Sequence, residues 1–256
     1  MMVTNYPLPF VFEVPPRNPW EGLRTVELTI ETAAPLSAAD ADLLQDNVFP
    51  FWMLASSGAL SLEAGAPPHP ALEQPSFSGS AQSARFVFDG WRLDERASHC
   101  LLCLLLAAHA DVPLKRVRLS SAGLVPRPIT VDPNLEEPYP KAPPKLPFPW
   151  SIEDSENDVR ELQVTFAAPL SDEQWELVAG ELTSAGIAIA AGAYGVAPVP
   201  PEDCGCLPSE DVEHSDNELR WALEKCRFHP AALDGLIGVC VSLHQHVAPI
   251  VGVTIT

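Results

Sequence analysis

RTVELTIETAAPLS at residues 24–37 and DVRELQVTFAAPLS at residues 158–171 are two versions of one segment. They align without a gap at a shift of 134 residues, and the run AAPLS is identical in both. Apolar and polar residues alternate in the first half of each version, which is the period of a half-buried strand. The serine that ends each segment, Ser37 or Ser171, is a typical helix N-cap. The chain therefore predicts a strand followed at once by a helix, twice.

The likeness extends well beyond this segment. A Pro-Trp pair precedes each version, at 19–20 and at 149–150. Further on, residues of the first copy recur at a shift of 135 and then 136: Arg85 with Arg220, Arg92 with Arg227, Leu101 with Leu236, His109 with His244, and Val117 with Val253. Because so small a drift in register rarely arises by chance, we interpret the chain as a tandem duplication.

Each copy is expected to contain the same series of elements. The helix after AAPLS should end near Ser56 or Ser184, and a short strand should follow. The remaining expected segments are strands at 59–62 and 187–190, irregular loops at 64–83 and 192–216, strands at 85–93 and 219–228, helices at 94–110 and 229–246, and closing strands at 115–120 and 250–256. This β-α-β-β-α-β order predicts an α+β fold, a duplicated ferredoxin-like unit with two four-stranded antiparallel sheets and helices on one face of each.

Proline marks the connections between these units. The chain has 28 prolines, and a proline lacks the N–H that helices and central strands need. We expect a proline-rich N-terminal arm at 1–23, the first repeat at 24–123, a proline-rich acidic linker at 124–157 and the second repeat at 158–256. The helical segment CLLCLLLAA at 100–108 is apolar nearly all round, more than one sheet requires. The two repeats should therefore pair as a pseudo-dimer within one chain.

The charge restricts the class of partner. The formal net charge is −19 at pH 7, whereas nucleic acids and anionic membranes require a basic surface. We expect neither as a partner. The sequence shows no signal peptide, and its longest apolar run, at 100–108, is too short to cross a bilayer. The expected location is the cytoplasm.

One stretch of the second copy is unusually acidic. Residues 202–218 contain seven acidic residues and no lysine or arginine, and the next basic residue is Arg220. The matching stretch of the first copy has only one acidic residue, Glu73. A difference confined to one copy is a candidate specialisation, and a basic partner would be attracted to it. The alternative is a solvated loop without a partner. The candidate partner-binding residues are Glu202, Asp203, Glu210, Asp211, Glu213, Asp216 and Glu218.

Metal-binding and catalytic signals are weak. Cys204, Cys206 and His214 have side chains that suit zinc, but one residue between two cysteines is not the usual ligand spacing. No catalytic motif is recognisable, so no catalytic residue and no cofactor are expected. His109 and His244 end equivalent helices, where the helix dipole favours a cation. Two such histidines facing each other across a cleft would be a second possibility.

Three hypotheses follow. The first is a non-catalytic protein that binds and neutralises another protein, as a bacterial immunity protein blocks a basic, nuclease-type toxin. The alternative is a small-molecule- or metal-binding protein or an enzyme, with a site between the repeats near His109, His244, Trp91 and Trp221. The third is a structural subunit that uses the proline-rich arm to pack against a neighbour.

Overall fold

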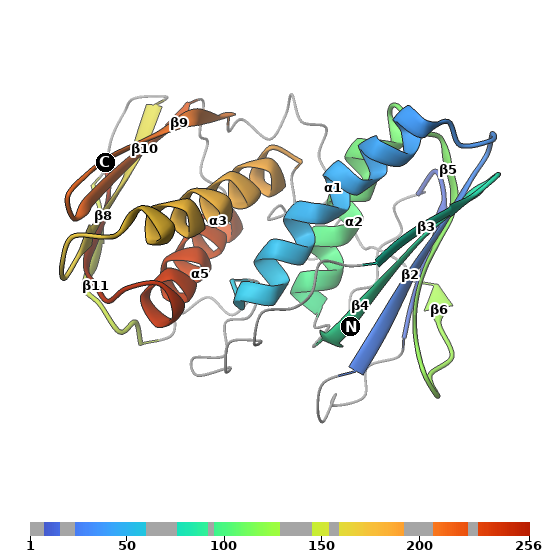
Figure 1. The fold of residues 1–256 in the computed structure, drawn as a ribbon, viewed down its shortest axis with the longest axis horizontal. Helices are drawn as coiled ribbons and strands as arrows, with labels where there is room; N and C mark the ends of the chain where they lie inside the picture. The colour runs from blue at the N-terminus through green and yellow to red at the C-terminus, as the bar shows by residue number, and fades with distance from the viewer. Residues whose placement is uncertain are drawn as a thin grey trace.

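The computed structural model describes residues 8–15, 24–59, 76–91, 95–128, 145–153, 159–191, 207–224 and 230–256. Within these ranges the chain forms two sheets and four helices. The sheets lie on the outside and the helices between them, so the layers run sheet, helix pair, helix pair, sheet (Figure 1). Each sheet thus has its helices on one face.

The first half of the chain builds a six-stranded sheet in the order β3-β4-β2-β5-β1-β6. Its elements are β1 (Val11–Val14), β2 (Arg24–Thr32), α1 (Ala38–Ser57), β3 (Ser76–Ser80), β4 (Ser83–Trp91), α2 (Glu95–His109), β5 (Leu114–Ser121) and β6 (Arg127–Pro128).

The second half builds a five-stranded sheet in the order β7-β11-β8-β10-β9. Its elements are β7 (Trp150–Ile152), β8 (Val159–Phe166), α3 (Asp172–Ala190), β9 (Leu207–Ser215), β10 (Glu218–Glu224), α5 (Pro230–His246) and β11 (Ile250–Ile255).

The two halves share one arrangement of their central strands. The orders β3-β4-β2-β5 and β9-β10-β8-β11 are equivalent, and every pairing inside them is antiparallel. The α+β class is confirmed, and this layout is compatible with a duplicated unit. The prediction of two four-stranded, purely antiparallel sheets is wrong, because β1 pairs with β5 in parallel and β7 pairs with β11 in parallel. β6 adds a further antiparallel strand.

These extra strands come from the segments expected to be an arm and a linker. Phe12 lies opposite Val117 on β5, and Trp150 lies opposite Val253 on β11, which is the same register in both halves. The sequence match behind it is Leu-Pro-Phe at 8–10 and at 146–148. The Pro-Trp pair at 19–20 lies outside the described residues. Prolines beside these short strands made the strands hard to predict, because proline is rarely found within a strand.

Two strand predictions placed the second strand too early. Residues 187–190 belong to α3, which buries Ala185, Ala188 and Ile189 at helical spacing and leaves Ile187 exposed. Alanine is the strongest helix former, so the helix continues where alternation suggested a strand. The second strands are instead β3 and β9, both inside the expected loops. Of the strand expected at 59–62, only Ala59 is described, and it lies in the turn after α1.

The predicted helix caps are confirmed. Ser37 accepts a hydrogen bond from the backbone N–H of Asp40, and the Asp40 carboxylate accepts one from the N–H of Ser37. Ser171 and Gln174 form the same reciprocal capping box in the second half. A capping box satisfies two backbone donors that a helix start leaves unpaired.

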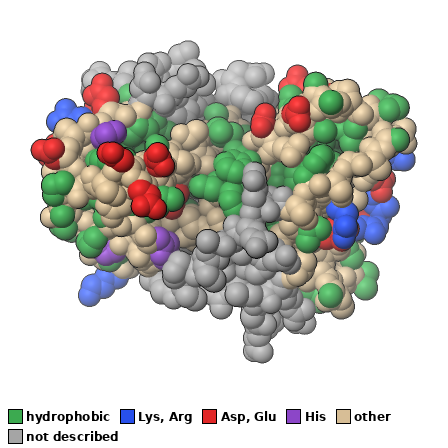
Figure 2. All heavy atoms as spheres, in the orientation of Figure 1, with side chains coloured by type: hydrophobic (Ala, Val, Ile, Leu, Met, Phe, Trp, Pro, Cys, Tyr) green, Lys and Arg blue, Asp and Glu red, His purple; other side chains and the backbone are tan. Residues whose placement is uncertain are grey.

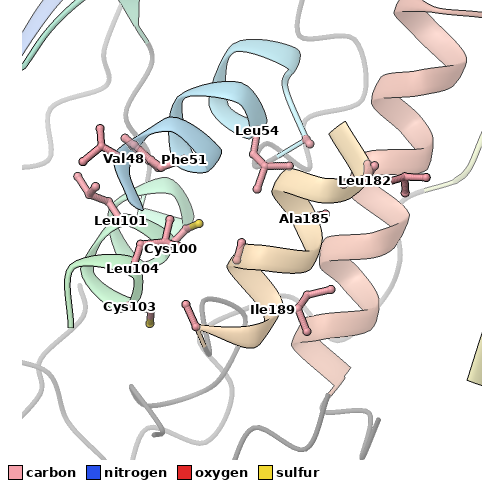
Figure 3. Packing of buried hydrophobic residues seen from close by; sticks show 14 of the residues in the cluster. Val48, Phe51, Leu54, Cys100, Leu101, Cys103, Leu104, Leu182, Ala185 and Ile189 are labelled. Carbon is pink, nitrogen blue, oxygen red and sulfur yellow. The ribbon is translucent and has the colours of Figure 1, made fainter. Parts of the chain in front are cut away.

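A single buried hydrophobic cluster runs through both halves. Helix α2 contacts α3 of the other half, so the apolar α2 is covered by the second half as well as by its own. Figure 3 shows this contact from close by, with Cys100 and Leu104 of α2 near α1 and Ala185 and Ile189 of α3 opposite them. Cys100 and Cys103 are buried.

Candidate functional site

The acidic stretch forms an edge hairpin in the structure, which replaces the expected loop. Glu210, Asp211 and Glu213 belong to β9, Asp216 lies in the turn, and Glu218 begins β10. We call residues 210–218 the acidic hairpin. Glu202 and Asp203 lie outside the described residues. Sequence reasoning missed β9 because its residues are mostly polar, and an edge strand has no need of an apolar pattern.

The tip of the acidic hairpin is fixed by hydrogen bonds to the rest of the second half. The Asn217 side chain donates to the Phe166 carbonyl over 2.9 Å, and the Phe166 N–H donates to the Asn217 carbonyl over 2.8 Å. The Leu170 N–H donates to the Asp216 carbonyl over 3.1 Å. Asp216 has a φ of 40°, a left-handed conformation that aspartate tolerates better than most residues. The exposed carboxylates of Asp216 and Glu218 are therefore presented from a defined backbone.

β9 is the last strand of its sheet. It pairs with β10, where Glu213 lies opposite Arg220, and its other edge has no partner strand in the described part of the chain. Glu213, Asp216 and Glu218 are all exposed. An acidic edge strand disfavours association with other sheet edges, and the same charges attract a basic surface.

The cations of the first sheet are largely committed to ion pairs. The Arg116 and Arg118 side chains each donate to the Glu13 carboxylate over 2.8 Å, and Arg85 donates to Glu27 over 2.6 Å. These hydrogen bonds from Arg116 and Arg118 lower the pKa of Glu13 against the opposing effect of burial. Figure 2 shows acidic and histidine side chains gathered over α3 and the neighbouring strands of the second half, at the left of the view.

Only one of the three metal candidates, His214, lies among the described residues. Cys204 and Cys206 lie outside them. His214 is exposed and stacks on Trp175 of α3, with ring centroids 4.3 Å apart and an interplanar angle of 22°. No group of three metal-type side chains occurs in the described ranges. The visible role of His214 is to join β9 to α3.

The equivalent histidines have a structural role in each half. The Leu114 N–H donates to Nδ1 of His109 and the Ile250 N–H donates to Nδ1 of His244, both over 2.9 Å. The two rings pack on Phe10 and Phe148, with centroids 5.6 and 5.5 Å away. Each histidine thus ties a helix end to the next strand, and Nδ1 acts as an acceptor, which a cationic imidazole cannot do.

Of the two tryptophans in the alternative hypothesis, only Trp221 has a described side chain. Trp221 on β10 is 1% exposed and belongs to the core of the second sheet. Trp91 ends β4, and its side chain lies outside the described part of the structure. Trp221 is therefore a core residue. The described residues show no site formed by these tryptophans together with His109 and His244.

A buried carboxyl lies where helices of the two halves meet. Glu181 of α3 is 6% exposed, and its Oε1 is 3.2 Å from the Ser242 hydroxyl of α5. The same hydroxyl is 3.0 Å from the Ser57 carbonyl at the end of α1. We call the contact among Ser57, Glu181 and Ser242 the junction. Oε2 of Glu181 is buried and has no hydrogen-bond partner in the structure.

Burial raises the pKa of the Glu181 carboxyl to about 7, while the Ser242 and Ser57 hydroxyls act in the opposite direction. Burial also raises the pKa of the Cys240 thiol to about 12, and the nearby Glu181 adds to that rise. Sequence analysis did not single out Glu181. The signal was an acid three residues after the buried Val178 and four before the buried Ala185, inside the apolar stripe of α3.

No protein-family model matches the chain, and no curated protein matches it. The described helices include none that is both long and apolar enough to cross a membrane.

Proposed function

We propose that the chain is a non-catalytic protein that binds and neutralises another protein, in the manner of a bacterial immunity protein, and that its partner is basic. The observation that supports this most is the acidic hairpin. Its carboxylates belong to an edge strand and a turn that is hydrogen-bonded to β8 and to the segment before α3. Ordered charge costs less entropy on binding than charge on a mobile loop.

Further features support parts of this proposal. The net charge of −19 attracts cationic proteins over long range and speeds their encounter. Cys240 is a buried free thiol, as is usual in a reducing compartment, which supports a cytoplasmic location. The matched capping boxes and histidines support our inference that the halves are copies of one ferredoxin-like unit.

The alternative of a small-molecule or metal site between the repeats finds no supporting observation in the described residues. The region where α1 and α2 meet α3 is occupied by apolar side chains of the core (Figure 3).

The test compares two variants of equal charge. The hairpin variant carries Glu213→Gln, Asp216→Asn and Glu218→Gln; the control carries the exposed-site changes Asp42→Asn, Asp46→Asn and Asp111→Asn. Tagged wild type and both variants are used to retain proteins from the native cells at low salt, and the retained proteins are quantified by mass spectrometry. We expect a basic protein that the wild type and the control retain and the hairpin variant loses.

The purified partner then gives a rate measurement. Its association with the hairpin variant should be on the order of tenfold slower than with the control, with a weaker dependence on salt. Equal rates for both variants would remove the acidic hairpin from the argument. Failure of the wild type to protect cells that express the partner would show that binding is not neutralisation.

A further inference from the structure

The junction poses a problem of hydrogen-bond accounting. The Ser242 hydroxyl has one proton and lies within hydrogen-bond distance of two acceptors, the Ser57 carbonyl at 3.0 Å and Glu181 Oε1 at 3.2 Å. If Glu181 is ionised, Ser242 can serve only one of these acceptors, and the Ser57 hydroxyl can serve the other only by giving up the Leu54 carbonyl, to which it donates over 3.2 Å. If Glu181 is protonated, its own O–H can donate to Ser242 while Ser242 donates to Ser57, so both acceptors are satisfied.

An ionised Glu181 would also be a buried charge without a counter-ion. Glu181 is 6% exposed, Oε2 has no partner, and no cation among the described residues pairs with it. A buried, unpaired carboxylate costs several kcal/mol, which a protein avoids by keeping the group neutral or by opening to water. The site therefore favours the protonated form for geometric reasons alone.

The junction connects the two halves directly. Ser57 ends α1 of the first half, whereas Glu181 and Ser242 belong to α3 and α5 of the second. Gly238, one turn before Ser242, approaches Ala59 so closely that a Cβ atom would lie 2.4 Å from its carbonyl oxygen. α5 thus packs closely against the end of α1, and the buried Glu181 carboxyl lies at this contact.

The first repeat lacks this feature. At the shift of 134 residues, the counterpart of Glu181 is Asn47, whose amide donates to the Leu43 carbonyl over 2.9 Å. An amide does not ionise, so only the second repeat brings a titratable group to this helix position.

We propose that Glu181 is a proton-operated latch between the repeats: the protonated carboxyl holds α3 and α5 against the end of α1, and ionisation favours opening of the junction. The latch is independent of the proposed partner. Because the pKa of Glu181 is raised to about 7 in the closed form from an ordinary 4.5, the closed form binds more protons than the open form between these values. Rising pH across this window therefore favours opening.

The other titratable side chains near α3 do not account for this dependence. Cys240 has a pKa raised to about 12, and burial lowers the pKa of His246, so closing disfavours protonation of His246, the opposite sign to Glu181. The remaining described titratable groups on the elements that contact α3 are not among the causes of the raised pKa of Glu181: Asp40, Asp42 and Asp46 on α1, Cys100, Cys103 and His109 on α2, His244 on α5, and Glu213 and His214 on β9.

The test follows exposure of Cys240, which is buried beside Glu181. The full-length protein is treated with a thiol-alkylating reagent between pH 5 and pH 8, and labelling of Cys240 is followed by mass spectrometry. The ratio of the wild-type rate to the Glu181→Gln rate at each pH cancels the intrinsic reactivity of the thiol. We expect this ratio to rise on the order of tens of times from pH 5 to pH 8.

Two controls make the result decisive. Glu176→Gln, an exposed site on the same helix, should behave as the wild type. If Glu181→Gln does not fold, the carboxyl of Glu181 is titrated by carbon-13 NMR in the folded wild type, where a midpoint near 7 is expected. A labelling ratio that stays constant with pH, or a midpoint near 4.5, would overturn the latch.

Discussion

At the scale of single residues, two positions of α5 explain how closely the halves approach. Gly238 and Ser242 are four residues apart and so lie on one face of the helix. Gly238 provides space for the Ala59 carbonyl, and Ser242 provides the donor for the Ser57 carbonyl. A residue larger than glycine at position 238 would move α5 away from the end of α1 and so separate the Ser242 hydroxyl from the Ser57 carbonyl.

Gly238→Ala should therefore destabilise the protein. A Cβ atom 2.4 Å from the Ala59 carbonyl requires α5 to move, and overpacking of this kind costs about 1–3 kcal/mol even after the better helix propensity of alanine is counted. Urea unfolding of the full chain measures the loss. The matched control is Gly252→Ala on β11, where no atom lies within 4 Å of the added Cβ, and its free energy of unfolding should change by less than about 0.5 kcal/mol.

At the scale of elements, the added parallel strands β1 and β7 are secured differently in the two halves. Glu13 of β1 holds Arg116 and Arg118 of β5 at 2.8 Å. At the matching place, Ser151 of β7 contacts the Thr254 hydroxyl of β11 at 3.4 Å. The first half thus holds its added parallel strand with an ion pair, and the second half with a weak neutral contact.

Glu13→Gln should cost about 1 kcal/mol at pH 7, because both arginines are partly exposed and solvent screens the pair. The lowered pKa of Glu13 means that its stabilisation is present above the unfolded value of 4.5 and is lost as pH falls through the folded value. The difference in unfolding free energy between wild type and variant should therefore shrink below about pH 4. Ser151→Ala is the control and should show almost no effect at either pH; an undiminished difference in acid would contradict the ion-pair account.

The sequence predicted an element correctly where the alternation of apolar residues and the helix-capping residue both indicated it. Strands β2 and β8 and the starts of α1 and α3 follow from alternation and from Ser37 and Ser171, all of which act locally. The strands β1, β3, β6, β7 and β9 lie at or next to a sheet edge, and they were missed because such strands tolerate proline and polar residues. The acidic residues of the candidate site could be identified from the sequence, but their position on a strand could not. Glu181 required knowledge of which helices meet.

At the scale of the whole molecule, the core is continuous across the two halves. Leu54 of α1 is fully buried and points toward α3 of the other half, where Ala185 lies (Figure 3). Burial of α2 against α3 extends this contact. The two halves should therefore unfold together, although each has its own sheet.

Leu54→Ala tests this cooperativity. Removing a buried leucine costs about 2–5 kcal/mol, and because both halves share the cluster the whole transition should move to lower temperature as one. Differential scanning calorimetry measures it, with the ratio of calorimetric to van 't Hoff enthalpy as the criterion. A second peak that keeps the wild-type melting temperature would show that the repeats are thermodynamically separate.

The junction also has a consequence for the order of events during synthesis. Ser242 and Ser57 are 185 residues apart, and Glu13 is separated from Arg118 by 105. A growing chain can make α1 and α2 well before α3 and α5 emerge, so the side of α2 that contacts α3 has no cover until the second half has been translated. Contacts so distant in sequence form slowly, and an uncovered helix invites aggregation in the meantime. The nascent first repeat is thus the form of this protein with the greatest need of a chaperone.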